Sequence, residues 1–194
     1  MPFDTSSQQN DTAIREKVDK LATFIADDLS ERTASGLPAG DSYLVIARSP
    51  KSPVAQALRA NAAKLAEAGI TVRAIFSEAD PILTDDITGP FAAPCECRSV
   101  RDRRLLAAHE QLVLGSTSTW IGDSMRREPT KRDTYEHFAP RSVATTAIAT
   151  RSFERIWRSA APVRALAAMP GGLASQLPGM TADRVVQPDT LRRQ

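Results

Sequence analysis

The chain lacks the long apolar runs of a membrane protein, because no stretch approaches the roughly 20 residues that a transmembrane helix needs. Its first residues, Met1 to Asp11, are polar and lack the basic-then-apolar pattern of a secretory signal. Cysteine is nearly absent, since Cys95 and Cys97 are the only two and are one residue apart. So close a pair rarely forms a disulfide. We therefore expect a cytoplasmic protein without a membrane span.

Potential metal ligands are also scarce. Besides carboxylates and the two cysteines, the chain has only His109 and His137. Because a zinc site needs three or four clustered ligands, we expect no metal and no other cofactor. In a strand the side chains of Cys95 and Cys97 point to the same face, so two small buried or half-buried thiols are the expected arrangement.

Aromatic residues and glycine-rich phosphate loops are few or missing. Only 5% of the residues are aromatic, and they do not alternate with basic residues as in platforms that stack single-stranded nucleic acid. No Gly-x-Gly-x-x-Gly or Walker-type loop is present. Composition therefore neither indicates nor excludes nucleic acid as a partner.

The composition that remains is that of an ordinary globular protein. The 194 residues are 42% hydrophobic and 25% charged, with a net charge of +2, which fits one domain with a sizeable core. We expect a disordered tail over residues 1–11, a single α/β domain over residues 12–165 and a tail rich in proline and glycine over residues 166–194. The sequence of this last segment indicates no role for it.

The periodicity of the apolar residues predicts a mixed sheet that contains a βαβ unit and is flanked by helices. In the first half, the predicted elements are a helix over 12–32, a strand over 42–47, a helix over 53–68 and a strand over 70–76. Ser52 is the expected cap of the second helix, and Gly69 ends it. The residues expected in buried strands of the sheet are Leu44, Val45, Ile46, Val72, Ile75, Leu112, Val113 and Leu114.

The second half predicts three more strands and a closing helix. The strands are expected over 95–100, 111–114 and 119–121, with 115–118 as a hairpin connection between the last two. Residues 125–141 are charged and are expected to be irregular. The helix over 142–160 has Val143, Ala147, Ile148, Phe153, Ile156 and Trp157 as candidate core residues.

The segment from His109 to Ser124 resembles the catalytic motif of the phospholipase D superfamily, which reads His-x-Lys, four residues, Asp, six residues, Gly-Ser-x-Asn. His109 and Ser124 stand at the His and Ser positions. The other four positions differ: Gln111 replaces Lys, Ser116 replaces Asp, Asp123 replaces Gly and Arg126 replaces Asn. The order of elements from Ser42 to Val163 is similar to one half of such a domain, in which a helix with a Phe and a Trp closes the half.

The resemblance implies a chemistry that this chain carries only in part. In that family the motif His attacks phosphorus, a second motif's His protonates the leaving group, and Lys and Asn hold the phosphoryl oxygens. His109 retains the nucleophile, but Gln111 brings no positive charge. Ser116 cannot orient an imidazole as a carboxylate would. Because only one motif-like segment is present, the resemblance implies a homodimer or a lone half.

A local excess of basic residues surrounds the motif. The arginines and lysines that precede His109 or follow Ser124 are Arg98, Arg101, Arg103, Arg104, Arg126, Arg127, Lys131 and Arg132. Such a zone attracts phosphate or another anion, although a solvated surface with compensating acids has the same composition. The expected catalytic residues are therefore His109 and Ser124, and the expected anion-binding residues are Gln111, Arg126, Arg127 and Arg104.

Several functions remain open from the sequence. The incomplete motif favours a non-catalytic or weakly catalytic domain that binds a phosphate-bearing or other anionic ligand. An active phosphodiesterase or nuclease that uses His109 from two subunits is the first alternative, and a small α/β protein-interaction module is the second. Gly122-Asp123-Ser124 begins like the Gly-Asp-Ser-Leu esterase signature, but the segment lies past mid-chain and no Asp-x-x-His follows. A phosphate site at Arg48–Ser52, where a strand meets a helix, competes with a plain capped turn.

Overall fold

The computed structural model describes residues 5–36, 42–78, 95–100, 109–125 and 136–163, and for residues 5–10, 123 and 124 it describes the backbone alone. Within these ranges the elements, in chain order, are α1 (Thr5–Ser35), β1 (Ser42–Ala47), α2 (Pro53–Ala60), α3 (Ala62–Glu67), β2 (Thr71–Phe76), β3 (Cys95–Ser99), β4 (His109–Leu114), β5 (Ser118–Ser124), β6 (Glu136–Ala139), α4 (Val143–Ser159) and β7 (Ala161–Pro162). The expected tail over residues 166–194 lies outside the described residues.

The strands form one mixed seven-stranded sheet in the order β6-β5-β4-β1-β2-β3-β7. The neighbours β1 and β2 are parallel, as are β2 and β3, whereas every other pair is antiparallel. The predicted α/β class, mixed sheet and βαβ unit are therefore confirmed. None of the helices in the described ranges combines the length and apolarity needed to cross a bilayer.

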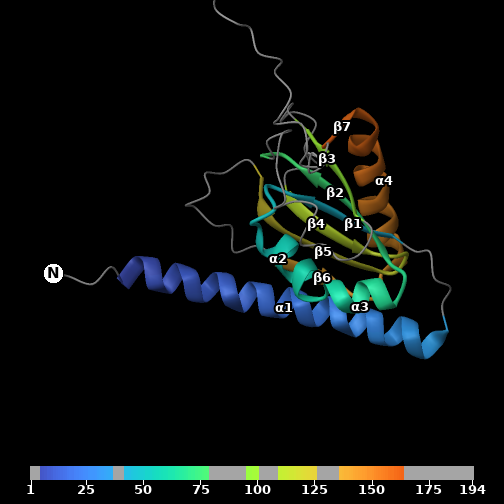
Figure 1. Ribbon diagram of the computed structural model, residues 1–194, viewed down its shortest axis with the longest axis horizontal. Coiled ribbons are helices and arrows are strands. Elements are labelled where there is room, and N and C mark those ends of the chain that lie inside the picture. Colours follow the sequence, from blue (N-terminus) through green and yellow to red (C-terminus); the bar gives the residue numbers. More distant parts are fainter. Residues whose placement is uncertain (1–4, 37–41, 79–94, 101–108, 126–135, 164–194) are drawn as a thin grey trace, which may run out of the picture.

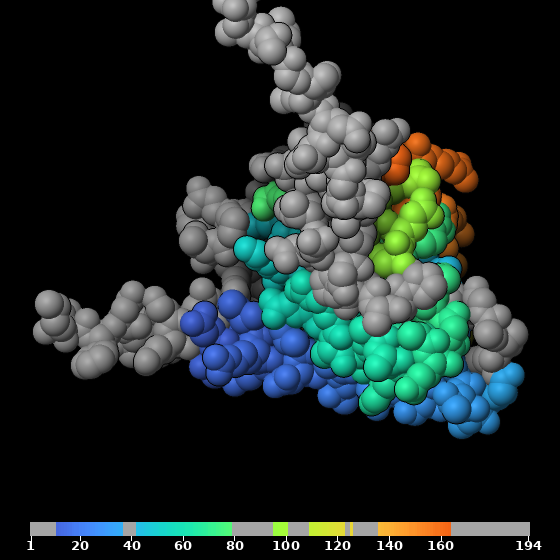
Figure 2. All heavy atoms as spheres, viewed as in Figure 1, coloured from blue at the N-terminus to red at the C-terminus, as the bar shows by residue number. Residues whose placement is uncertain are grey.

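Helices cover both faces of this sheet (Figure 1), so the central strands contribute alternate side chains to two apolar layers. Tyr43 and Val45 pack with α1, α2 and α3 on one face. Leu44 and Ile46 pack with Phe153 and α4 on the other. All eight residues predicted for the buried strands are buried. Figure 2 shows α1 and the α2–α3 segment side by side along one face of the molecule.

Helix α1 is longer than the sequence predicts. It starts at Thr5 rather than Thr12, so residues 5–11, expected to belong to a disordered tail, are helical. No proline or glycine occurs between Thr5 and Ser35, so nothing in the polar start of the segment interrupts the helix. Gly36 ends it with a φ of 59°, a left-handed conformation that glycine adopts easily.

The helix predicted over residues 53–68 is instead two helices that meet at Asn61. The side-chain amide of Asn61 donates to the carbonyls of Ala57 and Ala22, each at 3.1 Å. Its backbone N–H bonds to the carbonyl of Leu58 rather than to that of Ala57. The side chain thus takes the carbonyl that the helix would have used and ties the break to α1. Gly69 follows α3 with a φ of 65°, as predicted.

Two features of the second half correct the prediction. Residues 136–139, expected to be irregular, form β6 at the edge of the sheet beside β5. Helix α4 faces the sheet with Thr146, Ala149, Phe153, Ile156 and Trp157. Val143 and Ile148, expected in the core, are 63% and 62% exposed.

Contacts with the sheet decide which side of α4 faces inward. Thr119 of β5 donates a 2.8 Å hydrogen bond to Thr146. Farther along, the guanidinium carbons of Arg73 and Arg98 lie 4.4 and 4.3 Å from the centre of the Trp157 ring. These contacts at the two ends hold one stripe of α4 against the sheet, and Val143 and Ile148 fall outside that stripe.

Candidate functional site

The hairpin of β4 and β5 brings the two ends of the motif together. His109 opens β4, Ser124 closes β5, and the two are partners in the antiparallel ladder. The register shifts between His109 and Glu110, because Glu110 is paired with Gly122 and Asp123 is the additional residue. Such a bulge redirects the strand locally and is common beside functional sites. The structure therefore places the backbones of both expected catalytic residues at one end of the hairpin.

His109 and Gln111 point to the same side of the sheet and line one cavity of about 260 Å³. The cavity lies between this hairpin and α4, since its other lining residues are Ile121 of β5 and Thr145, Ile148, Ala149 and Ser152 of α4. The hydroxyl of Thr145 accepts a 2.8 Å hydrogen bond from Ser142 and keeps its own proton to donate. The cavity thus combines an imidazole, an amide and two hydroxyls with apolar walls. We call it the His109 pocket.

Gln111 is already used in the fold. It is 5% exposed, and its Nε2 atom donates to the carbonyl of Ala149 at 3.3 Å. This bond ties β4 to α4 at the bottom of the pocket. Gln111 therefore has a structural contact as well as its expected place beside His109, and it supplies no positive charge there.

Two other residues considered from the sequence lie outside the His109 pocket. Ser116 is exposed in the turn after β4, and the strand from His109 to Leu114 alone spans about 16 Å at 3.3 Å per residue. A carboxylate at position 116 would therefore not contact this imidazole within one chain, which corrects the role considered for it. His137 is exposed on β6, where it is paired with Ile121, and it does not line the pocket.

The turn between β1 and α2 is occupied by a side chain of the protein itself. The Oε1 atom of Glu110 accepts hydrogen bonds of 2.7 Å from the backbone N–H of Arg48 and from the hydroxyl of Ser52. Glu110 is 4% exposed. Ser52 makes no side-chain capping bond to α2, contrary to expectation. The carboxylate thus takes two of the donors that this turn could offer to a phosphate, which favours a structural role for the Arg48–Ser52 turn.

The contribution of α4 to the pocket was not predicted from the sequence. Thr145, Ala149 and Ser152 recur at spacings of four and three, which is the signal that could have revealed it. Arg151 follows Ile148 by three residues, and Arg155 follows Ser152 by three, so both arginines lie one turn beyond pocket-lining positions. Both are exposed, and among the described residues neither has an acidic partner. They add positive charge beside the pocket.

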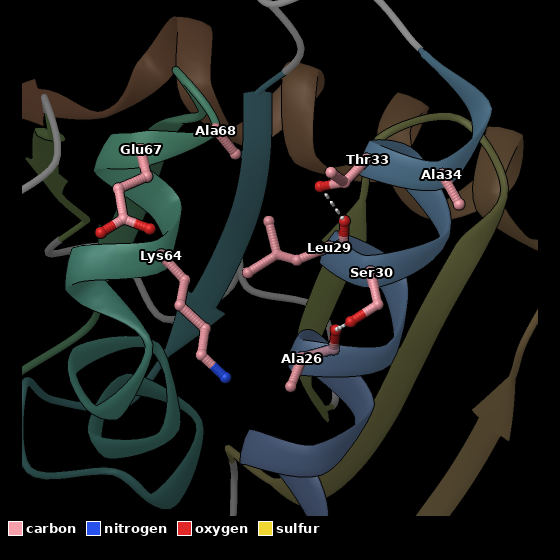
Figure 3. Close-up of a pocket in the computed structure, with 8 residues that line it drawn as sticks. All are labelled: Ala26, Leu29, Ser30, Thr33, Ala34, Lys64, Glu67 and Ala68. Atoms are coloured by element: carbon pink, nitrogen blue, oxygen red, sulfur yellow. Dashed lines mark hydrogen bonds between the residues drawn. The ribbon is translucent and has the colours of Figure 1, made fainter.

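A second cavity, of about 650 Å³, lies between the C-terminal half of α1 and α3. Figure 3 shows Lys64 extending from α3 toward α1. The hydroxyls of Ser30 and Thr33 donate to the carbonyls of Ala26 and Leu29 within α1, at 2.8 and 2.9 Å. Both hydroxyl protons are therefore used within α1, and the charged groups that line this cavity are Lys64 and Glu67 of α3.

The expected anion-binding residues Arg104, Arg126 and Arg127 lie outside the described residues, as do Arg101 and Arg103. Of that basic zone, Arg98 is described: it lies on β3, stacks on Trp157 and donates a 2.9 Å hydrogen bond to the Trp157 carbonyl. Within the described ranges, no three His, Cys, Asp or Glu side chains converge where a metal ion could bind. The chain matches none of the protein-family models with which it was compared, and no curated protein matches it either.

Proposed function

We propose that this protein is a phospholipase D-like domain with a degenerate motif, and that it binds a phosphate-bearing or other anionic ligand at the His109 pocket with little or no catalysis. One observation carries the proposal: His109 and Gln111 line a single cavity at the end of β4 where His109 is paired with Ser124. Thr145 and Ser152 supply hydroxyl donors in the same cavity. Arg151 and Arg155 extend the binding surface with positive charge beside its edge.

The same arrangement explains why we expect binding rather than turnover. A phosphodiester needs a nucleophile, an acid for the leaving group and cations for the charged transition state. His109 is the only histidine that lines the pocket in the described part of the chain, and no lysine or arginine there lines it. Loss of one such electrostatic contact costs about 3–4 kcal/mol of transition-state stabilisation.

Titration of the full-length protein with inorganic phosphate, followed by calorimetry, tests the binding. Removal of two adjacent cations costs about 1.4 kcal/mol, so we expect an Arg151→Ala, Arg155→Ala double variant to bind about tenfold more weakly. His109→Ala is expected to weaken binding as well. The matched control removes two exposed lysines from the other side of the sheet, Lys20→Ala with Lys64→Ala, and should leave affinity unchanged. Equal affinity in all of these proteins would reject the site.

Incubation with bis(p-nitrophenyl) phosphate tests the expected lack of turnover. Slow or undetectable hydrolysis that His109→Ala does not change supports a binding role. Rapid turnover that His109→Ala abolishes, with a trapped phospho-His109, would instead establish the active phosphodiesterase. In that case sedimentation should show a homodimer, because a second histidine must come from another copy of the chain.

A further inference from the structure

The two cysteines form a contact that the proposed function does not use. Cys95 and Cys97 lie on β3, and their Sγ atoms are 3.3 Å apart. Cys97 is 6% exposed and belongs to the apolar layer on the α1 side of the sheet, against which Cys95 packs. Cys95 is half-buried and therefore has a route to solvent. Two thiols on one face were predicted, but their direct contact was not.

The pair shares one hydrogen-bonding proton, and either sulfur can be the donor. A thiolate at Cys97 accepts a hydrogen bond from Cys95, and this bond is the main reason why the pKa of Cys97 is lowered. The pKa of Cys95 is raised, chiefly by the same bond. The negative charge therefore rests mainly on Cys97. Transfer of the shared proton from Cys95 to Cys97 places it on Cys95, and this less populated form exposes the thiolate on the sulfur that a small oxidant reaches.

The backbone is held more firmly at Cys97 than at Cys95. Cys97 is held by β2 and also by Val163, whose N–H donates to the Cys97 carbonyl at 2.9 Å. Cys95 is the first residue of β3 and is paired with Val72 of β2, whereas the β7 ladder begins only at Arg98. A disulfide needs the two sulfurs about 1.3 Å closer than they are. The Cα atoms of residues two apart in a strand are about 6.6 Å apart, which is near the upper limit for a disulfide. A small movement at Cys95 supplies this closure.

We propose that Cys95 and Cys97 are a reversible oxidation site, which hydroperoxides convert to an intramolecular disulfide. The Cys95 thiolate attacks one peroxide oxygen, so an S–O bond forms, the O–O bond breaks and the alcohol leaves after taking up a proton. Cys97 then attacks the sulfenic sulfur of Cys95, the S–S bond forms, and the oxygen leaves as water with the proton of the second thiol. The two sulfurs are oxidised and one hydroperoxide is reduced to alcohol and water.

The experiment treats the reduced full-length protein with cumene hydroperoxide and then counts free thiols in denaturant and measures the intact mass. We expect wild type to lose both thiols, to become lighter by the mass of two hydrogen atoms, to remain monomeric on a non-reducing gel, and to recover both thiols with dithiothreitol. Cys97→Ser should stop at the sulfenic acid of Cys95, which dimedone traps. Cys95→Ser should react more slowly than either protein, because its remaining thiol is buried.

Circular dichroism of the two variants checks that each still folds, and glutathione in the same tube reports that the oxidant is active. Retention of both thiols by wild type while glutathione is oxidised would overturn the proposal. Separate oxygen addition at each cysteine, or disulfide-linked dimers, would overturn it too. None of these readouts depends on the His109 pocket, so this site and the proposed function fail or stand separately.

Discussion

The Oε1 atom of Glu110 accepts a 2.7 Å hydrogen bond from the hydroxyl of Ser52, 58 positions earlier in the chain. The same oxygen accepts the backbone N–H of Arg48, so one buried carboxylate joins the start of β4 to the turn before α2. His109 and Gln111, its neighbours in β4, line the cavity on the opposite side of the sheet. Glu110 therefore anchors the strand that presents the proposed site.

Replacing this carboxylate should destabilise the protein. For Glu110→Ala we expect a loss of about 1–3 kcal/mol in the free energy of unfolding, because the Arg48 N–H and the Ser52 hydroxyl lose their acceptor. Urea denaturation measures the change. The matched control is Glu78→Ala, which removes a more exposed carboxylate 3.9 Å from Arg48 and should cost less than about 0.5 kcal/mol. Equal losses in the two variants would contradict a special role for Glu110.

The buried contact between Tyr43 and Asp28 predicts a pH dependence of stability. Tyr43 is fully buried and its hydroxyl donates a 2.5 Å hydrogen bond to Asp28, whose carboxylate also binds Arg32 at 2.6 Å. Burial is the main reason why the pKa of Tyr43 is raised, and the Asp28 carboxylate raises it further. Below pH about 10 the phenol is neutral in both folded and unfolded chains. At higher pH only the unfolded chain ionises, so this contribution to stability is lost as pH rises.

Unfolding by urea at pH 9 and pH 11 tests this linkage. Tyr43→Phe should show a weaker decline of stability across this range than wild type, by up to about 1.4 kcal/mol per pH unit. At pH 7 the same variant should be about 1 kcal/mol less stable, because it lacks the hydrogen bond to Asp28. Parallel pH profiles for the two proteins would contradict the assignment of this decline to Tyr43.

Trp157 of α4 packs against side chains of both β2 and β3. Arg73 and Arg98 each stack on its ring, and Arg73 also pairs with Glu154. We expect Trp157→Leu to lower the free energy of unfolding by about 2–4 kcal/mol, through lost burial and two lost cation–π contacts. Thermal denaturation followed by circular dichroism gives the change, and exposed Arg158→Leu is the control. A loss below about 1 kcal/mol would show that α4 is held mainly by its other contacts.

Local patterns predicted most of the sheet, because its central strands contain apolar runs that are visible in the sequence. Leu44, Val45 and Ile46 form a continuous apolar run, and both faces of β1 are indeed covered. β6 was not predicted, because Glu136 and His137 are polar and the strand exists through its pairing with β5. The break at Asn61 likewise depends on a carbonyl of α1, which is far away in sequence. Such tertiary contacts leave no local pattern to detect.

Local patterns likewise predicted only the part of the candidate site that β4 and β5 form. A hairpin returns its two ends to one place, so the proximity of His109 and Ser124 followed from the turn at Gly115. The wall formed by α4 depends on how that helix is rotated, and a helix with alanine, threonine and isoleucine on several sides does not reveal its inward face. The contact of Thr146 with β5 and the contacts of Trp157 with arginines of β2 and β3 decide the rotation.

A lysine at position 111 would place the charge that the motif lacks into the His109 pocket. Gln111→Lys buries an ammonium group at a position that is 5% exposed, so the variant should be less stable than wild type by several kcal/mol in the absence of anions. A phosphoryl group bound beside His109 would pair with this ammonium group. Because the anion binds the folded state, added phosphate should raise the melting temperature of the variant more than that of wild type. Gln111→Leu, of similar size and without charge, controls for the lost bond to Ala149. The same rise in melting temperature with phosphate in all three proteins would contradict an anion site at this position. A rise confined to the lysine variant would show that the pocket has the geometry for a phosphate and lacks only the charge.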